Sequence, residues 1–498
     1  MVDAPLVSKL PLAESFEAGY LDYNGILPLE IVGDRLRVAV VGEPAPEVLD
    51  DLEMSFDLAL ETVPVTREEL TDGIRRAYAA AESVVELVRD LDAAVTGDGE
   101  GIDASFTDAR DLANQPPVIR FVNLLIRDAH DARASDIHLE STREGLRARF
   151  RIDGVLTDVP SPPKGLQAAV VSRVKLLAEL DIAERRLPQD GRIRVRLEER
   201  ELDLRVSTVP TLYGESVVLR LLDRGGRPVA LDELGMAPET LARFRAIALR
   251  PHGIILATGP TGSGKTTTLY AALGLRQRGA EKIITVEDPV EYHLDGVTQV
   301  PVNRKAGVSF ASALRSLLRQ DPDVLMVGEM RDGETAEIAV QAAMTGHLVF
   351  STLHTNDALG AIPRLADLKV EAYLVAATVE GVLAQRLVRR VCPDCQERYT
   401  PDPQAVALLA RKPVGAETLV RGTGCPTCRG TGYRGRIGIF ELVVMTDELK
   451  QAMARVAPAE KLRELALAAG MVTLRADGWA KVQAGLTTVE EVLRVTEH

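Results

Sequence analysis

The residues best suited to chemistry lie in one glycine-rich segment near the middle of the chain. Gly259-Pro260-Thr261-Gly262-Ser263-Gly264-Lys265-Thr266, with Thr267 beside it, fits the pattern G-x-x-x-x-G-K-[ST]. It follows an apolar run, Ile254–Thr258, that predicts a buried strand, and it opens a predicted helix over Lys265–Leu275. Glycines let backbone N–H groups surround an anion, which the helix N-terminus also attracts. The pattern therefore predicts an ATP-binding loop in which Lys265 binds the β- and γ-phosphates and Thr266 ligates Mg²⁺.

Two acidic clusters follow this loop, each at the end of a predicted strand. Glu287-Asp288-Pro289-Val290-Glu291 follows the strand Lys282–Val286, and Gly328-Glu329 follows the strand Val324–Val327. The carboxyl ends of parallel strands face the ligand crevice, where a carboxylate holds Mg²⁺ or orients the attacking water. Glu287, Glu291 and Glu329 are therefore candidate catalytic residues for hydrolysis. The sequence leaves open which of the three acts as the base.

All four cysteines of the chain occur in one region, as two C-x-x-C pairs. Four thiolates in two such pairs match the tetrahedral ligand set of Zn²⁺, although the loop between the pairs is longer than in an ordinary zinc ribbon. Every position around the metal would be filled by protein, so the predicted zinc is structural. Two redox-active pairs are the alternative, but no aromatic or basic flank of a redox motif supports it. The predicted zinc ligands are Cys392, Cys395, Cys425 and Cys428.

Four motifs in this order resemble those of the secretion ATPase superfamily. They are the phosphate loop, an aspartate box over Ile284–Glu291, a glycine-containing Walker B segment at Gly328-Glu329, and a histidine box over Thr345–Thr355. The resemblance runs from about residue 110 to the C-terminus and is weaker over residues 1–92. A tetracysteine insert after the ATPase core resembles the secretion and pilus-extension branches rather than the pilus-retraction branch. Among these, the chain most resembles the ATPase of a type II secretion system.

The resemblance also implies roles for residues outside the phosphate loop. Arg205 and Arg220 match family arginines that sense phosphate, and His354 is implied at the catalytic centre. His347, Arg315 and Arg319 are implied in nucleotide binding, although an ordinary solvated helix face is the alternative for the two arginines. The family forms hexamers with active sites at domain and subunit junctions. Hydrolysis would therefore occur in a homohexamer.

The order of predicted elements divides the chain into six parts. Residues 1–92 predict a small α/β unit, with strands at Leu36–Val41 and Phe56–Val63 and helices at Pro46–Leu52 and Arg67–Tyr78. Residues 93–117 are rich in turn formers and acids and predict a mobile linker. The other predicted parts are an α+β domain (118–232), the ATPase domain (233–390), the zinc element (391–430) and a mostly helical remainder (431–498).

Strands and helices alternate over residues 240–390, a pattern typical of a parallel sheet. Together with the resemblance, this predicts an α/β fold: a RecA-like phosphate-loop core with a preceding PAS-like α+β domain, an N-terminal docking domain and a tetracysteine zinc insert. Strands are predicted in the α+β domain at Asp136–Glu140, Leu146–Ile152, Arg192–Leu197, Leu202–Val209 and Ser216–Leu222, and in the core at Gly253–Thr258, Lys282–Val286, Val324–Val327 and Leu348–Leu353. Helices are predicted at Val118–Arg133 and Leu166–Leu180.

Charge and hydropathy bear on location and on rival functions. The net charge of the 498-residue chain is −14, and basic residues are not interleaved with aromatic ones, which argues against a nucleic-acid translocase. Intact Lys265, Thr266 and Glu329 argue against a scaffold that binds nucleotide without hydrolysing it. We find no signal peptide and no apolar run long enough to span a bilayer, so we expect a cytoplasmic protein.

The N-terminal unit contains no catalytic pattern, and we expect it to dock the chain to a membrane partner. By resemblance, that partner is the cytoplasmic domain of the inner-membrane secretion L protein, with the inner-membrane platform F protein as a second partner. No nucleic-acid partner is expected. The protein would then lie at the cytoplasmic face of the inner membrane and work in pseudopilus assembly and protein export. A type IV pilus extension ATPase, with the same chemistry, is the alternative.

Overall fold

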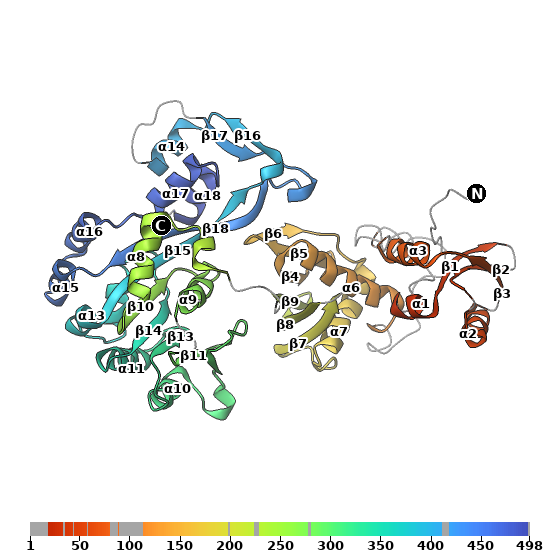
Figure 1. Cartoon of the computed structure of the whole chain (residues 1–498), viewed down its shortest axis with the longest axis horizontal. Helices are drawn as coiled ribbons and strands as arrows, with labels where there is room; N and C mark the ends of the chain where they lie inside the picture. Colours follow the sequence, from red (N-terminus) through yellow and green to blue (C-terminus); the bar gives the residue numbers. More distant parts are fainter. Residues whose placement is uncertain are drawn as a thin grey trace.

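The computed structural model describes residues 18–32, 35–42, 44–56, 58–79, 88, 113–197, 200–223, 229–276, 280–410 and 418–496. Four β-sheets organise these residues, with three, six, seven and two strands (Figure 1). None of the helices in this part of the chain is long and apolar enough to cross a lipid bilayer. The predicted domain boundaries stay predictions, and most of the predicted linker, 93–117, lies outside the described residues.

The N-terminal unit is a three-stranded sheet with helices around one apolar core. Its elements are α1 (Ala18–Asn24), β1 (Ile26–Val32), β2 (Arg35–Val40), α2 (Pro46–Phe56), β3 (Ala59–Pro64) and α3 (Arg67–Ala79). β2 lies between an antiparallel β1 and a parallel β3. The sequence pattern predicted β2, α2 and α3 but missed α1 and β1. It also began β3 too early, because Phe56 ends α2.

A six-stranded antiparallel sheet follows, and two helices pack on it. The elements are α6 (Pro116–Asp131), β4 (Ala134–Ser141), β5 (Leu146–Ile152), β6 (Val155–Asp158), α7 (Gln167–Leu177), β7 (Gln189–Leu197), β8 (Arg200–Thr211) and β9 (Gly214–Asp223). The strand order is β6-β5-β4-β9-β8-β7. Phe121 of α6 and Val170 of α7 are buried in one cluster with Phe150 and Leu204 of the sheet. The helices therefore share one core with the sheet, as expected for an α+β layer.

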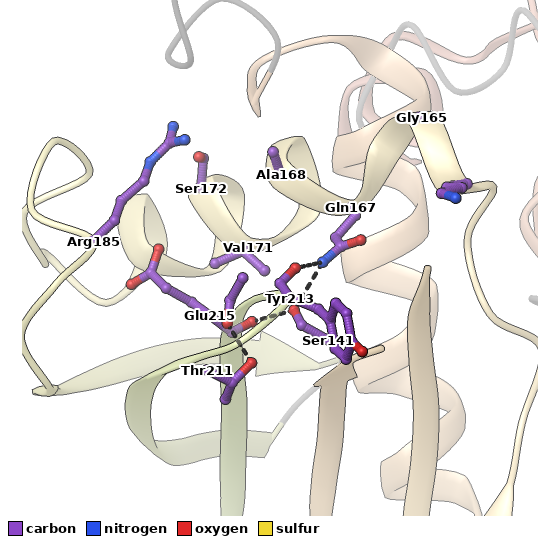
Figure 2. Close-up of a pocket in the computed structure, with 12 residues that line it drawn as sticks. Ser141, Gly165, Gln167, Ala168, Val171, Ser172, Arg185, Thr211, Tyr213 and Glu215 are labelled. Atoms are coloured by element: carbon purple, nitrogen blue, oxygen red, sulfur yellow. Dashed lines mark hydrogen bonds between the residues drawn. The ribbon is translucent and has the colours of Figure 1, made fainter. Parts of the chain in front are cut away.

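A cavity of about 360 Å³ lies in this unit between α7 and the β8–β9 hairpin (Figure 2). Glu215 lines it and forms an ion pair of 2.8 Å with the buried side chain of Lys175. None of the predicted site residues lines this cavity. It is therefore separate from the nucleotide chemistry.

The ATPase core is a seven-stranded sheet of order β12-β11-β13-β14-β10-β15-β18. Its strands are β10 (Gly253–Thr258), β11 (Ile283–Glu287), β12 (Thr298–Pro301), β13 (Val324–Val327), β14 (Leu348–Leu353), β15 (Val379–Val391) and β18 (Tyr433–Val444). The first six are mutually parallel. Its helices are α8 (Pro238–Ala248), α9 (Lys265–Leu273), α10 (Phe310–Leu317), α11 (Gly333–Met344), α12 (Ala361–Asp367) and α13 (Ala372–Thr378).

Alternate side chains of β10 enter two different cores, one on each face of the sheet. Ile255 and Ala257 pack with α8 and α9, whereas Ile254 and Leu256 belong to the cluster that holds α10 and α11. This burial on both faces explains the continuous apolar runs that predicted the parallel strands. The sheet ladder fixes the strand ends, and so it positions the loops that follow them.

Residues 431–498, predicted to be mostly helical, begin with a strand that the sequence did not predict. Tyr433–Val444 is β18, which pairs antiparallel with β15, and β15 was also not predicted. These two strands lie on either side of the cysteine element, so their pairing is a long-range contact that a local window of sequence does not contain. Beyond β18 the chain is helical, as predicted: α15 (Asp447–Ala454), α16 (Ala459–Ala468), α17 (Leu474–Gln483) and α18 (Val489–Thr496).

Candidate functional site

The glycine-rich loop joins β10 to α9, as its sequence predicts. Gly259, Gly262 and Gly264 have φ angles of 146°, 79° and 87°, which side chains with a Cβ atom adopt at a cost. The Lys265 Nζ atom donates to the carbonyl oxygens of Gly259 and Pro260 at 2.8 and 2.9 Å, and so lies within the loop. The Ser263 hydroxyl is buried and has no hydrogen-bond partner among the described residues. The loop therefore presents a cation and an unpaired donor, and these groups fit a phosphate chain.

Lys265 is nearly buried, and its charge is sensitive to its neighbours. The pKa of its ammonium group is lowered to about 8, mainly by burial; the Glu329 carboxylate opposes this shift, and the Arg386 charge adds to it. The structure therefore brings Glu329 close enough to act on the P-loop lysine. A buried ammonium with a depressed pKa gains from an anionic ligand, because the ligand offsets its lost hydration.

Glu329 follows β13, and two further side chains lie beside its carboxylate. Arg331 lies 2.6 Å from Oε1, and the Nε2 atom of His354, from the end of β14, lies 3.6 Å from Oε2. Burial lowers the pKa of His354, and the Lys265 charge adds to this effect. Near neutral pH the imidazole is therefore mainly uncharged. Lys265, Glu329 and His354 form one site at the carboxyl edge of the sheet.

The two carboxylates of the aspartate box are placed differently from Glu329. Glu287, at the end of β11, is buried; it accepts hydrogen bonds from the Tyr270 hydroxyl and from Thr285 at 2.5 Å. Burial raises the pKa of Glu287. Glu291 is exposed, and its charge acts on Arg205. Of the three predicted carboxylates, only Glu329 is described in contact with the histidine box.

The two predicted phosphate-sensing arginines lie on the six-stranded sheet. An Nη2–H of Arg205 donates to the backbone carbonyl of Val290 in the aspartate box at 3.2 Å, so this side chain reaches the ATPase core. Burial lowers the pKa of Arg205, and Glu291 opposes this shift. Arg220 lies opposite Arg205 on β9 and binds Asp136 at 2.9 Å. Arg205 therefore connects the two units, whereas Arg220 is held within its own sheet.

His347 is at the opposite edge of the core sheet from the P-loop. Its carbonyl oxygen accepts a hydrogen bond from the N–H of Gly253, the first residue of β10. The P-loop follows the last residue of β10, which lies about 17 Å from the first at ~3.3 Å per residue. Its Nδ1 atom contacts the Ala342 carbonyl at 2.9 Å. The structure does not bring His347 to this chain's own P-loop. A nucleotide-binding role for His347 therefore stays a prediction that needs a neighbouring subunit.

Arg315 and Arg319 are exposed at the carboxyl end of α10. Arg315 forms an ion pair with Glu334 at 2.5 Å, and Arg319 donates to the Arg315 carbonyl at 2.9 Å. None of these contacts involves the P-loop. Within one chain, Arg315 and Arg319 therefore do not reach the nucleotide site. Their predicted role in nucleotide binding would need the site of a neighbouring subunit.

Two residues next to the P-loop carried no signal that predicted a role for them. Gln385 of β15 packs against the loop glycines, and Arg386 of the same strand contacts the histidine-box loop. Their proximity follows from the pairing of β15 with β10, which local sequence does not reveal. Arg331 was also given no role by the sequence, although its place two residues after the Walker B glutamate Glu329 was an available signal.

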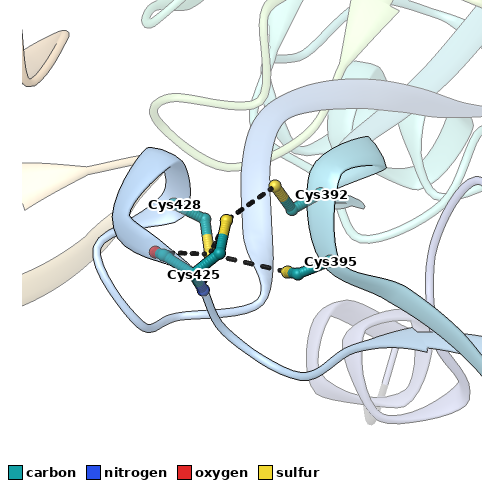
Figure 3. A group of neighbouring side chains, drawn as sticks. All are labelled: Cys392, Cys395, Cys425 and Cys428. Atoms are coloured by element: carbon teal, nitrogen blue, oxygen red, sulfur yellow. Dashed lines mark hydrogen bonds between the residues drawn. The ribbon is translucent and has the colours of Figure 1, made fainter.

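The four cysteines form one compact cluster, in which short 3-10 turns over Pro393–Cys395 and Pro426–Cys428 bring each pair together (Figure 3). Sγ–Sγ distances are 3.9 Å for Cys392–Cys425, 3.8 Å for Cys395–Cys428 and 3.7 Å for Cys425–Cys428. Four ligands at ~2.3 Å from a tetrahedral Zn²⁺ lie about 3.8 Å apart. The cluster therefore has the ligands and the spacing to hold a metal ion.

Backbone N–H groups also favour the thiolate form of one cysteine in this cluster, Cys428. The N–H groups of Cys425 and Gly432 donate to the Cys428 sulfur at 3.1 and 3.2 Å. Burial raises the pKa of Cys428, but these donors outweigh it and hold the pKa at about 6. Thiolates are the form that ligates zinc, so this donor set agrees with the ligand geometry. Nearby, β16 (Gln396–Tyr399) and β17 (Leu419–Gly422) form the two-stranded sheet, with α14 (Pro403–Ala410) between them.

Comparison with known proteins gives the same family over almost the whole chain. The family model described as "Type II/IV secretion system protein" matches residues 111–494, and the MshEN domain model matches residues 3–84. The type II secretion system protein E of Xanthomonas campestris pv. campestris is 47% identical over 494 residues, which cover 98% of this chain and 86% of that protein. The type II secretion system ATPase E of Vibrio cholerae serotype O1 is 49% identical over 391 residues, 78% of each chain.

A pilus protein is also similar. The type IV pilus assembly ATPase PilB of Myxococcus xanthus is 44% identical over 479 residues, covering 94% of this chain and 83% of that protein. Among solved structures, the pilus retraction motor PilT with bound ADP has a TM-score of 0.51 at 26% identity and covers 75% of this chain and 96% of that one. The ATPase DotB of Legionella pneumophila has the same fold, with a TM-score of 0.56 at 19% identity, covering 76% of this chain and 95% of that one.

These similarities confirm the resemblance that the four motifs indicated, and with it the α/β fold class. The matched region of the family model contains the P-loop, Glu329, His354 and the cysteine cluster. The chain is an ATPase of the type II/IV secretion system protein family, and its curated relatives include type II secretion ATPases.

Proposed function

We propose that this chain is the motor ATPase of a type II secretion system, which works as a homohexamer and couples ATP hydrolysis to pseudopilus assembly and protein export. The observation that supports this most is the alignment with a type II secretion system protein E over 98% of the chain, the N-terminal unit included. The site geometry supports the chemistry. Lys265, Glu329 and His354 converge beside a glycine loop that fits a phosphate chain.

The residues of the site suggest a division of labour. Lys265 and the loop N–H groups bind the β- and γ-phosphates, and Thr266 is placed at the start of α9 to hold Mg²⁺. Bound Mg²⁺ neutralises charge that develops on the phosphates. Glu329 is the strongest candidate to orient and deprotonate the attacking water, because it faces Lys265 and His354. Glu287 instead fixes the end of β11 through Tyr270 and Thr285, and Glu291 acts on Arg205.

Closure of the six-stranded unit onto the ATPase core would transmit the hydrolysis cycle. Arg205 supports this, because it is the predicted arginine that already reaches the aspartate box in this chain. The predicted residues whose described contacts within one chain do not involve the P-loop would act at subunit junctions; they are Arg220, Arg315, Arg319 and His347. Four cysteine thiolates would hold one structural Zn²⁺ in the segment that joins the end of β15 to the start of β18.

The N-terminal unit has its own apolar core and no catalytic constellation among its described residues. We therefore assign it the docking role: it binds the cytoplasmic domain of an inner-membrane secretion L protein, while the ATPase acts on the platform F protein. The protein would then be cytoplasmic and peripheral at the inner membrane. It would need no nucleic acid.

A host strain that lacks this chain tests the proposal. Wild type should restore secretion of exported proteins, whereas Lys265→Ala should not. A chain without residues 1–92 should keep basal ATP hydrolysis but should no longer sediment with membranes. Sedimentation equal to wild type would contradict the docking role.

The pilus-extension function is the second candidate, because PilB of Myxococcus xanthus aligns over 94% of this chain. The same strain separates the two functions. Loss of surface pili with normal secretion would assign the chain to pilus extension and would overturn the secretion proposal.

A further inference from the structure

The strand β15 lies directly beside β10 and parallel to it (Figure 1). Thr258, the last residue of β10, pairs with Ala384. The next two residues of β15, Gln385 and Arg386, therefore lie alongside the first turn of the P-loop. Both are almost fully buried, with 2% and 6% of their surface exposed.

Gln385 contacts the P-loop at two of its glycines and α9 at one side chain. Its amide oxygen accepts a hydrogen bond of 2.6 Å from the buried Thr268 hydroxyl. A Cβ atom at Gly259 would lie 2.5 Å from the Gln385 carbonyl oxygen, and one at Gly264 would lie 2.7 Å from its amide nitrogen. The backbone and side chain of Gln385 thus form the surface against which the loop is shaped.

Arg386 connects the same strand to the histidine box. Its guanidinium donates to the Asn356 carbonyl at 2.8 Å and to the Gln385 carbonyl at 3.2 Å. Asn356 is two residues from His354, which faces Glu329. Arg386 therefore holds the histidine-box loop beside the strand that supports the P-loop.

The charge of Arg386 is poorly compensated within the described part of the chain. No carboxylate there lies within the 4.0 Å of an ion pair, and the guanidinium is satisfied by backbone carbonyls. Burial lowers the pKa of Arg386, although the more distant Glu441 and Asp357 oppose this. Its charge also acts on Lys265. Two buried cations therefore lie beside one loop, and an anion bound there would stabilise each of them.

We propose that Gln385 and Arg386 are positioning residues of the nucleotide site, which join the P-loop to the histidine box and add a second buried positive charge beside Lys265. Gln385 fixes the glycine turns of the loop. Arg386 fixes the loop that carries His354, and its charge favours the bound phosphates. Through these two residues, β15 supports a nucleotide site whose other residues belong to the P-loop, Walker B and histidine-box motifs.

The test measures ADP affinity by calorimetry, kcat for ATP hydrolysis and melting temperature in the full-length chain. Arg386→Gln should weaken ADP binding about tenfold, as expected for loss of one charge-assisted contribution, and should lower kcat further. Arg386→Lys keeps the charge and should restore most of the affinity, but not kcat, because an ammonium does not reproduce the fork that reaches both carbonyls.

Arg389→Gln is the matched control. Arg389 lies on the same strand and forms a part-buried ion pair of 2.6 Å with Glu491 of α18. Its loss should lower the melting temperature and leave ADP affinity unchanged. If Arg386→Gln likewise lowers only the melting temperature, the positioning role is wrong.

Gln385→Leu tests the pair without altering charge, and it keeps the proposal testable if Arg386→Gln does not fold. Removal of the Thr268 hydrogen bond should weaken ADP binding by roughly threefold to tenfold. Wild-type affinity and kcat in Gln385→Leu would contradict its role in shaping the loop.

Discussion

The Nε2 atom of His354 lies 3.6 Å from the Glu329 carboxylate, although the two residues follow different strands. Those strands, β14 and β13, are adjacent and parallel, so both end at the edge where β10 leads into the P-loop. Sheet order therefore brings the Walker B and histidine-box residues to Lys265.

Replacement of Glu329 by Gln should separate nucleotide binding from hydrolysis. The amide keeps the size of the side chain but cannot accept the proton of the attacking water. We expect ADP affinity to change little and kcat to fall by about 10²-fold or more, a typical effect of a positioned base. Steady-state kinetics and calorimetry measure the two quantities. Glu337→Gln, an exposed carboxylate on α11, is the control and should hydrolyse ATP as wild type does.

Nucleotide affinity should depend on pH through Lys265, whose pKa burial lowers to about 8. Bound phosphates favour the charged form, so the pKa is higher in the complex than in the free protein. Affinity should therefore be greatest below pH 8 and should fall, by at most about tenfold per pH unit, as pH rises from there toward the pKa of the complex. Lys265→Arg keeps its charge over this range. If the nucleotide affinity of Lys265→Arg falls with pH as steeply as that of wild type, Lys265 is not the titrating group.

Arg205 should affect turnover more than affinity. Its guanidinium reaches the Val290 carbonyl across the two units, and an arginine at a phosphoryl-transfer site contributes on the order of 10³-fold in rate. Arg205→Ala should therefore lower kcat strongly and leave the ADP dissociation constant nearly unchanged. Arg194→Ala removes an exposed arginine of β7 and should have little effect on either. Equal kinetics in the two variants would remove Arg205 from the site.

The sequence predicted the parts of the site that local patterns encode. Short motifs encode the P-loop and the cysteine pairs, and apolar runs encode the strands that precede the P-loop and Glu329. The structure has these strands, and the loop and the cysteine turns follow them in the chain. The positions of Gln385 and Arg386 had no such motif, because they depend on which strand lies beside β10. The long β15–β18 pair was missed for the same reason. His347 belonged to a recognisable motif, but the motif does not reveal that this residue precedes β14, at the end of the strand opposite to the P-loop.

The cysteine cluster should hold about one zinc ion per chain, because one set of four thiolates fills one tetrahedral site. Elemental analysis of the purified protein measures this. Cys395→Ser should lower the zinc content and make residues 392–428 more sensitive to protease, since the metal joins the two turns. Basal nucleotide affinity should be retained, because the cluster is separate from the P-loop. Metal-free protein with unchanged stability would contradict a structural zinc site.

The most direct test of the central claim is ATP hydrolysis by Lys265→Ala. The buried ammonium of Lys265 is the P-loop cation that the structure places within reach of both the loop carbonyls and Glu329. Its loss should reduce hydrolysis to background, while Lys461→Ala, a control at an exposed lysine of α16, should retain wild-type turnover. Wild-type hydrolysis by purified Lys265→Ala would contradict the assignment of this loop as the catalytic site.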